Sequence, residues 1–185
     1  MFLRSLTPPE RRAVYHDHIQ RDIPPAGPKD FALLERLHAD GVCRALGMFD
    51  DAQELAGYAY IQHPADCAIE LLDFFAVFDS RRGAGLGQRF LRLLTEKERF
   101  GPTLAAEVED PDFAAAEERA LCERRLGFYA RCGWHDTGVR VAVGPYRCRI
   151  LSPSESVNES LLRASLAALY RAVFGPWAEE NTEIK

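Results

Sequence analysis

The chain has 185 residues, of which 47% are hydrophobic and 28% are charged, and its net charge is −5. A chain of this length can enclose a full core, so we expect residues 1–185 to form a single domain. The acidic balance argues against nucleic acid as a partner, because phosphates favour clustered Lys and Arg. The sequence shows neither an apolar run of membrane-spanning length nor a signal peptide. We therefore expect no membrane contact and a cytoplasmic location.

The first part of the chain carries signals for two helices and a hairpin. Thr7 is an N-cap candidate, with Pro8 at the first helical position and Glu10 three residues after the cap. The prolines of "RDIPPAGP" then impose a loop, and a second helix is expected over residues 30–39, ending at Gly41. The strand-like runs "VCRALGMFD" and "ELAGYAYIQ", joined through "DDAQ", predict a β-hairpin.

The middle of the chain alternates between strand and helix patterns. Residues 68–78 ("AIELLDFFAVF") are almost continuously apolar, which predicts a central strand covered on both faces. From Leu86 the apolar spacing becomes helical, and this helix is expected to end at Gly101 and Pro102. Residues 103–109 ("TLAAEVE") predict the next strand.

The last third predicts a helix, a hairpin and a second helix. Asp110 and the proline after it are expected to cap a helix that stops at Gly133, and "GVRVAVG" with "YRCRILS" resembles a hairpin. Residues 157–174 form an amphipathic pattern, which we expect to dock on its own domain, with a homodimer contact as the second use of that face. Its apolar side consists of Leu162, Leu166, Leu169 and Val173. Pro176 and the residues after it are expected to fray.

Cysteine and histidine give no sign of a disulfide framework or a metal site. The five cysteines include no CxxC pair, and their odd number fits no closed set of disulfides, so we expect reduced and mostly buried thiols. His16 and His18 are two residues apart and would point in different directions on a helix. We therefore expect no bound metal.

The stretch "FFAVFDSRRGAGLGQRFLRLL" places a glycine-rich turn between a strand and a helix. The first N–H groups of a helix lack partners inside the helix and attract anions. Gly83, Gly85 and Gly87 would remove the side chains that keep an anion from the backbone, while Arg81 and Arg82 would add positive charge. A phosphate site is one interpretation, and a turn that merely packs tightly is the other.

Two common phosphate motifs do not fit this turn. A P-loop requires GxxxxGK[ST], and no lysine followed by Ser or Thr is present here. A Rossmann fingerprint requires GxGxxG, and Gln88 stands where the third glycine belongs. Glu107 and Glu109 do lie near the position of a ribose-binding acid, so a dinucleotide site is kept as an alternative.

The turn resembles the acyl-CoA signature of the GNAT N-acetyltransferase superfamily, [Q/R]xxGxG/A. Arg82, Gly85 and Gly87 occupy its three defined positions. Downstream, "RRLGFYARCGW" (124–134) resembles the family's second landmark, an aromatic pair several residues before a Gly-aromatic. The similarity covers about residues 42–150, and the two motifs occur in the family's order.

This resemblance implies an α/β (α+β) fold of three layers. A mixed, mostly antiparallel central sheet of about six to seven strands would have helices on both faces. Its two central parallel strands, 68–78 and 103–109, would be splayed. Many members carry an asparagine after the second of these strands; this chain has "EDPDF" there, so no asparagine role is carried over.

The resemblance also implies acetyl-CoA as the cosubstrate. Its pantetheine arm would pair with the strand edge at Phe75, Ala76 and Val77, and an N–H near Phe75 would polarise the thioester carbonyl. The pyrophosphate would contact the main-chain N–H groups of Arg82, Gly83, Ala84, Gly85, Leu86, Gly87 and Gln88.

Two proton transfers remain in such a reaction. By the family motif Tyr129 is the candidate acid that protonates the CoA thiolate, with Phe128 as the alternative occupant of the motif position. Glu107 and Glu109 share one side of a strand and are candidate bases, Glu107 first. Asp73 is a carboxylate inside an apolar strand, and burial requires that it be paired, by a salt bridge to an arginine, or functional.

The sequence therefore predicts an acetyl-CoA-dependent N-acetyltransferase acting on a primary amine of a small molecule or peptide by direct attack. The loop "RDIPPAGPKD" and the terminal hairpin would select the acceptor. The alternatives are a catalytically inactive acyl-CoA-binding module and, third, a dinucleotide-binding oxidoreductase.

Overall fold

A computed structural model describes residues 1–22, 29–65, 67–97 and 103–185. The chain divides into two compact units. The first comprises Met1–Ala65 and Leu72–Lys97, and the second comprises Asp66–Leu71 and Glu98–Lys185. The expected proline-imposed loop, and the helix end at Gly101 and Pro102, fall largely on positions outside the described residues.

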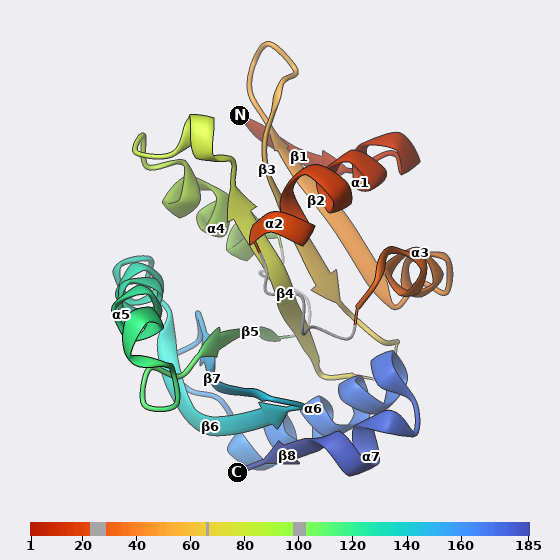
Figure 1. Cartoon of the computed structure of the whole chain (residues 1–185), viewed down its shortest axis with the longest axis vertical. Helices are drawn as coiled ribbons and strands as arrows, with labels where there is room; N and C mark the ends of the chain where they lie inside the picture. Colours follow the sequence, from red (N-terminus) through yellow and green to blue (C-terminus); the bar gives the residue numbers. More distant parts are fainter. Residues whose placement is uncertain (23–28, 66, 98–102) are drawn as a thin grey trace. The chain divides into compact units, whose positions relative to one another are not determined.

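The first unit consists of antiparallel strands with helices on both of their faces (Figure 1). In chain order its elements are β1 (Phe2–Ser5), α1 (Pro8–Val14), a π-helix (Tyr15–Ile19), α2 (Gln20–Asp22), α3 (Phe31–Ala39), β2 (Cys43–Phe49), β3 (Leu55–Gln62), most of β4 (Ile69–Val77), a 3-10 turn (Asp79–Arg81) and α4 (Leu86–Lys97). The expected hairpin is confirmed, because β2 and β3 pair antiparallel from Cys43↔Gln62 onward.

Local capping explains why the helices of this unit begin where the sequence predicts. The Thr7 main-chain N–H donates to the Glu10 carboxylate at 2.8 Å, and α1 begins at the next residue, Pro8. The Asp30 carboxylate accepts the Leu33 N–H at 2.7 Å and caps α3. Both starts agree with the expectations from the sequence.

The second unit combines the first residues of β4 with the C-terminal half of the chain. Its other elements are β5 (Thr103–Glu109), α5 (Ala116–Arg131), β6 (His135–Val143), β7 (Tyr146–Ser152), α6 (Glu159–Phe174), α7 (Trp177–Asn181) and β8 (Thr182–Ile184). The apolar side of α6 is buried within the chain, as expected: Leu162, Leu166, Leu169 and Val173 are each at most 1% exposed.

The strands form one mixed sheet in the order β1-β2-β3-β4-β5-β7-β6-β8. Strand β4 begins in the second unit, where the Thr103 N–H donates to the Ala68 carbonyl at 3.2 Å, and it continues in the first. The α/β architecture with a mixed sheet is therefore confirmed. The described residues form eight strands, slightly more than the expected six to seven.

Three sequence expectations need correction, and the two extra strands account for two of them. The segment from Pro176 does not fray: it forms α7 and then β8, which pairs antiparallel with β6 from Val141↔Ile184 to Val143↔Thr182. Residues Phe2–Ser5 form β1 on β2, which the sequence analysis did not anticipate. Both are short strands that are stabilised by a neighbouring strand rather than by a strong pattern of their own.

The third correction concerns α5, which begins at Ala116 and not at Asp110. The Asp110 carboxylate accepts the Asp112 N–H at 3.2 Å, as a cap does, but it also accepts a hydrogen bond from Arg149 at 2.9 Å, and only a turn follows it. A turn at residues 110–113 results, with the Phe113 N–H donating to the Asp110 carbonyl. The predicted end of the helix at Gly133 is confirmed by its φ of +79°.

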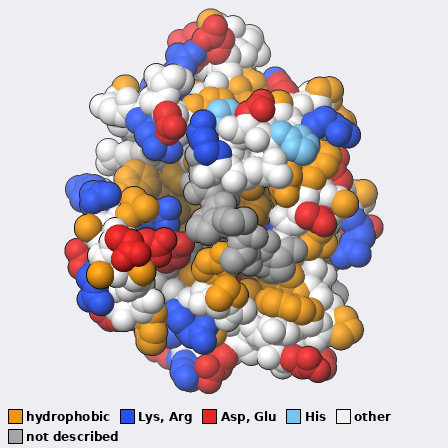
Figure 2. All heavy atoms as spheres, viewed as in Figure 1, with side chains coloured by type: hydrophobic (Ala, Val, Ile, Leu, Met, Phe, Trp, Pro, Cys, Tyr) orange, Lys and Arg blue, Asp and Glu red, His pale blue; other side chains and the backbone are white. Residues whose placement is uncertain are grey.

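The cysteines are free thiols, as expected from the sequence. No disulfide joins the five cysteines, all of which lie in the described part of the chain; Cys43, Cys122 and Cys148 are buried, and Cys67 and Cys132 are half-buried. Among the described residues, every helix is too short or too polar to cross a bilayer. On the face seen in Figure 2, basic and acidic side chains are interspersed rather than segregated.

Candidate functional site

The turn after β4 has the backbone of an open cradle. Gly83 and Gly85 have φ values of +89° and +70°, in the left-handed region that other residues avoid. A Cβ built on either glycine would meet no atom within 4 Å. These glycines are therefore needed for their conformation and not for close packing. This excludes tight packing as the explanation for the two glycines.

The helix that follows directs main-chain donors toward the same turn. Helix α4 begins at Leu86, and its first helical hydrogen bond runs from the Arg89 N–H to the Gly85 carbonyl at 3.1 Å. The N–H groups before Arg89 include those of Gly87 and Gln88, and the first N–H groups of a helix have no acceptor inside it. Phe90 and Leu94 anchor the helix in the core, each at 0% exposure.

The two arginines of the turn are held in different ways. Arg82 donates from Nε to the Val77 carbonyl at 3.1 Å and pairs with Asp79 at 2.6 Å, while 58% of its side chain is exposed. Arg81 instead pairs with Asp50 at 3.3 Å and with Glu54. Arg82 is thus fixed at the turn with its guanidinium accessible, whereas Arg81 ties the turn to the β2–β3 hairpin.

The last part of β4 is less buried than its beginning. Residues 73–76 are half-buried, whereas Ile69–Leu72 and Val77 are buried. On one edge β3 approaches very closely, because a Cβ on Gly57 would lie 2.5 Å from the Ala76 carbonyl oxygen. The ring of Phe75 packs on Phe90 of α4, with centroids 5.2 Å apart. Phe75, Ala76 and Val77 therefore sit in a strand that is fixed by β3 and by α4.

Asp73 is paired, and its partner is a lysine and not the arginine that one of the two interpretations of the sequence predicted. Lys29 Nζ lies 2.6 Å from Asp73 Oδ1, and the Gln62 side-chain amide donates to Asp73 Oδ2 at 2.9 Å. The Asp73 side chain is only 6% exposed. Asp73 thus forms a salt bridge, and its partner is Lys29.

The two candidate bases of β5 contact different helices. The Tyr170 hydroxyl of α6 donates to Glu107. Glu109 instead pairs with Arg125 of α5, and the Cys122 thiol lies 3.8 Å from it. Both carboxylates are half-buried. The structure thus places both of them in β5 as expected, each already engaged by a neighbouring helix.

Tyr129 lies on α5 and is buried among aromatic rings. It is 8% exposed, and its ring centroid lies 5.5 Å from that of Phe128 and 5.4 Å from that of Trp134. Burial raises the pKa of the Tyr129 phenol above its ordinary value, so the group carries its proton throughout the physiological range. Of the aromatic pair, Tyr129 is buried and Phe128 is half-buried.

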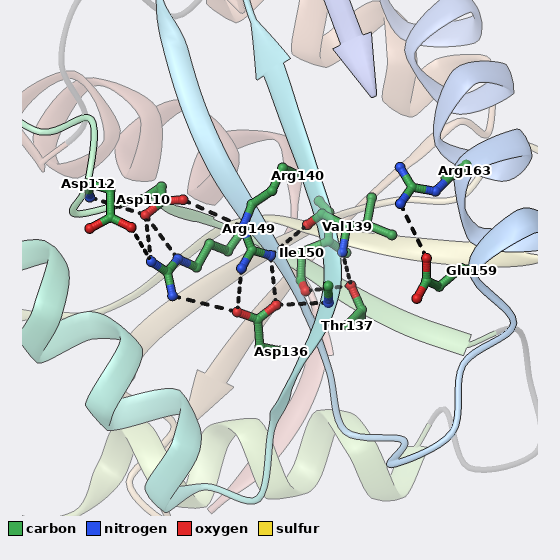
Figure 3. Close-up of polar contacts among 11 residues, drawn as sticks. Asp110, Asp112, Asp136, Thr137, Val139, Arg140, Arg149, Ile150, Glu159 and Arg163 are labelled. Carbon is green, nitrogen blue, oxygen red and sulfur yellow. Dashed lines mark hydrogen bonds and ion pairs between the residues drawn. The ribbon is translucent and has the colours of Figure 1, made fainter. Parts of the chain in front are cut away.

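The position after β5, where many GNAT proteins carry asparagine, is occupied by a charge network (Figure 3). Asp110 is 4% exposed and pairs with Arg149 at 2.8 Å and with Arg140 at 3.6 Å. Asp112 and Asp136 complete the network around the two arginines. Asp110 therefore links β5 to β6 and β7, which gives this residue a structural role.

His18 was not identified as a functional candidate from the sequence. It lies in the π-helix, and its ring stacks on Phe78 at 3.8 Å between centroids with an interplanar angle of 10°. Phe78 directly follows β4, and its N–H donates to the Ala56 carbonyl. A π-helix changes the direction of side chains relative to an α-helix, so helical periodicity could not have indicated this contact.

The predicted site residues therefore fall into two groups. Asp73, Phe75–Val77 and Arg82–Gln88 are together in the first unit, and Glu107, Glu109 and Tyr129 belong to the second.

Comparison with solved structures shows which fold these elements make. No protein-family model matches the sequence, and no curated protein matches it. A protein from Bacteroides thetaiotaomicron that is assigned to the GNAT family of acetyltransferases superposes with a TM-score of 0.72 at 18% identity, covering 95% of this chain and 99% of the other.

Two further similar structures contain coenzyme A. Spermidine N-acetyltransferase from Vibrio cholerae, in complex with CoA and spermine, has a TM-score of 0.59 at 13% identity, covering 81% of this chain and 92% of that one. An aminoglycoside 6'-N-acetyltransferase with coenzyme A also has a TM-score of 0.59, at 16% identity, covering 85% of this chain and 100% of that one. The protein therefore has the GNAT acetyltransferase fold.

Proposed function

We propose that this protein is an acetyl-CoA-dependent N-acetyltransferase that moves an acetyl group to the primary amine of a small molecule or peptide. The observation that carries the proposal is the open turn at residues 82–88. Two left-handed glycines with free space above them precede the N-terminus of a twelve-residue helix. This arrangement presents main-chain N–H groups to a diphosphate without steric hindrance.

The same turn supplies charge for the diphosphate. Helix α4 contributes the partial positive charge of its N-terminus, and the accessible guanidinium of Arg82 adds a full charge. The Arg82 bond to the Val77 carbonyl keeps this charge close to the end of β4. The residues present therefore fit the diphosphate of coenzyme A, which would supply the activated thioester.

The half-buried end of β4 supports the binding of the pantetheine arm. An extended amide-containing chain can pair with a strand through main-chain hydrogen bonds. Phe75, Ala76 and Val77 would provide these bonds, and an N–H near Phe75 would stabilise the oxyanion that forms when the amine attacks the thioester. The contacts of Phe75 with α4 and of Gly57 with Ala76 hold this segment rigid, as an oxyanion donor requires.

The proton transfers are assigned to residues of the second unit. Tyr129, whose raised pKa keeps it protonated, would donate to the departing CoA thiolate. Glu107 or Glu109 would accept the proton of the acceptor ammonium directly or through water. We propose Glu107 first, because Glu109 already forms an ion pair with Arg125, whereas Glu107 accepts a hydrogen bond from the Tyr170 hydroxyl.

A primary amine is the acceptor class that the comparisons support. The similar proteins named above are acetyltransferases whose names specify spermidine and an aminoglycoside, and both of these carry amines. The net charge of −5 is compatible with a cationic acceptor. Two other functions compete with this proposal: an inactive acyl-CoA-binding module and, ranked below it, a dinucleotide-dependent oxidoreductase.

An amine panel tests this proposal. The full chain is incubated with acetyl-CoA and one amine at a time, and the release of free CoA thiol is measured. We expect turnover with at least one small primary amine and none without amine. Binding of CoA without turnover on any amine or peptide N-terminus would favour the inactive module, and a thermal shift with NAD but not with CoA would favour the oxidoreductase.

A further inference from the structure

The buried cluster around Asp73 has the composition of a site for a primary ammonium group. Asp73 on β4 receives Lys29 Nζ at 2.6 Å and the Gln62 amide at 2.9 Å, and the Lys29 side chain is 10% exposed. Lys29 Nζ also lies 5.6 Å from the centroid of the Phe74 ring. A carboxylate, an amide and an aromatic ring thus surround one ammonium, and all of these residues belong to the first unit.

This cluster offers one acceptor more than is used. Gln62 is 0% exposed, and its Oε1 has no hydrogen-bond partner among the described residues. Buried amide oxygens are nearly always bonded, because they lose their bond to water on folding. A primary ammonium carries three N–H donors, so a suitably placed ammonium can satisfy both the Asp73 carboxylate and the Gln62 oxygen.

The choice of lysine at this position is unusual for this chain. The sequence contains 20 arginines and 3 lysines. The buried Arg11 of the first unit follows this preference and pairs with Glu35 at 2.6 Å. Lysine presents a compact point charge, whereas arginine presents a planar fork. The Asp73 cluster is therefore fitted to an alkylammonium and not to a guanidinium.

The cluster also lies close to the proposed reaction centre. Asp73 precedes Phe75 by two residues on the same strand, and at a rise of about 3.3 Å per residue their Cα atoms lie within about 7 Å of each other. Phe75 supplies the proposed oxyanion donor. An amine held by Asp73 would therefore approach the thioester carbonyl, which the acceptor nitrogen must reach.

We propose that Asp73 and Gln62 bind the ammonium group of the acceptor, and that Lys29 occupies this site until the acceptor replaces it. The acceptor would accordingly be a primary alkylamine that is cationic in solution. The assignment of the bound amine as an acceptor rests on the proposed acetyltransferase function, whereas the ammonium site itself does not.

Charge balance explains why we expect the acceptor ammonium to replace the Lys29 ammonium at Asp73 and not to bind beside it. Cys43 pairs with Gln62 in the hairpin register, and burial raises the pKa of its thiol to about 12, so Cys43 is neutral. Lys29 is the cation that pairs with Asp73 in this cluster. A second ammonium beside Lys29 would place two positive charges next to one buried carboxylate, which is unfavourable.

The test removes the ammonium group of Lys29 by mutation and supplies another ammonium from solution. Lys29→Ala leaves the space of three carbons and one nitrogen, which are the heavy atoms of n-propylamine. We expect calorimetry to detect n-propylammonium binding to the K29A chain at millimolar concentrations, together with a rise in its melting temperature. The uncharged analogue n-propanol should produce neither effect, and the double variant K29A/D73N should bind neither compound.

Failure of n-propylamine to bind K29A, or equal binding to K29A/D73N, would overturn the ammonium site. If the K29A chain is unfolded, n-propylamine should refold it. If n-propylamine does not refold K29A although K29A/D73N is folded, the ammonium site is likewise overturned. These readouts require no acetyl-CoA, so they separate this inference from the proposed function.

A kinetic comparison connects the site to the acceptor. With spermidine and n-propylamine as probe acceptors, Asp73→Asn should raise KM at least tenfold while the Kd for CoA stays within twofold. Glu35→Gln, which breaks the buried pair with Arg11 in the same unit, is the matched control and should leave both constants unchanged. A D73N chain with the KM of the wild type would refute the acceptor role, and absent turnover in the wild type would instead refute the proposed function.

Discussion

Gly85→Ala separates the folding role of the glycine turn from its proposed binding role. Gly85 has a φ of +70°, and no atom lies within 4 Å of the position that an added methyl group would take. The substitution therefore introduces no clash, and its cost to folding is the left-handed backbone penalty of about 1–2 kcal/mol. For a chain of this size we expect the melting temperature to fall by about 2–8 °C.

The effect on coenzyme A binding should be larger than this strain predicts. The added methyl group would occupy the open space through which the diphosphate reaches the backbone. Loss of one hydrogen bond between a main-chain N–H and a charged group costs about 1.5–3 kcal/mol, which corresponds to a loss of affinity of about 10- to 100-fold. Isothermal titration calorimetry with CoA measures this change.

Gly41→Ala provides the matched control. Gly41 lies in the same unit, follows α3, has a φ of +72° and likewise has nothing within 4 Å of an added Cβ. It should lose about the same stability as Gly85→Ala while its Kd for CoA stays within twofold of the wild type. Equal CoA affinity in the two variants would refute the assignment of the turn as the diphosphate site.

Three further predictions concern the acid, a pH effect and the charge network. Tyr129→Phe should lower kcat by about 100-fold or more while its affinity for CoA stays unchanged. A Tyr129→Phe chain with a kcat above half that of the wild type would contradict the role of Tyr129 as the acid. Because burial raises the pKa of Tyr129, the pH–rate profile of the wild type should show no basic limb from this group below about pH 10. The hydrogen bond from Arg4 lowers the pKa of Glu10 from 4.5 to about 2, so this pair stabilises the fold fully above pH 4.5 and progressively less as the pH falls to 2. Denaturant titrations should show a loss of about 0.2–1 kcal/mol over this range, as for other exposed ion pairs. Glu10→Gln should lack this part of the acid dependence. Asp110→Asn should reduce the free energy of unfolding by about 2–3 kcal/mol. This is less than the cost of breaking a buried ion pair completely, because Arg149 keeps its contacts with Asp112 and Asp136. A change below about 0.5 kcal/mol, which is typical of a surface substitution, would contradict the structural role of Asp110.

Much of this fold could be predicted because its signals are local. The cap at Thr7 marks the start of α1, and the glycine after α5 marks the end of that helix. The change from a continuous apolar run to helical spacing at Leu86 locates the boundary between β4 and α4. Such features depend on a few neighbouring residues, so they can be identified without knowledge of the tertiary contacts.

The remaining features depend on partners that are distant in sequence. Strands β1 and β8 have four and three residues and form against β2 and β6, so neither carries a sufficient pattern by itself. Asp110 has the local sequence context of a helix cap, but its carboxylate accepts a hydrogen bond from Arg149, which is 39 residues away in the sequence. The sequence allowed Asp73 either a salt bridge to an arginine or a functional role, and it could not select Lys29, 44 residues away, among the 23 basic residues.

The most direct test of the central claim is a calorimetric comparison of CoA with pantetheine, which lacks the diphosphate and the adenosine attached to it, in the wild type and in Gly85→Ala. We predict that the full chain binds one CoA with a dissociation constant between about 1 µM and 1 mM, the usual range for enzyme substrates. Pantetheine should bind at least tenfold more weakly, and Gly85→Ala should reduce this difference, because the turn at residues 82–88 contributes through the diphosphate. Equal affinity for the two compounds, or no binding of CoA at millimolar concentration, would contradict the account.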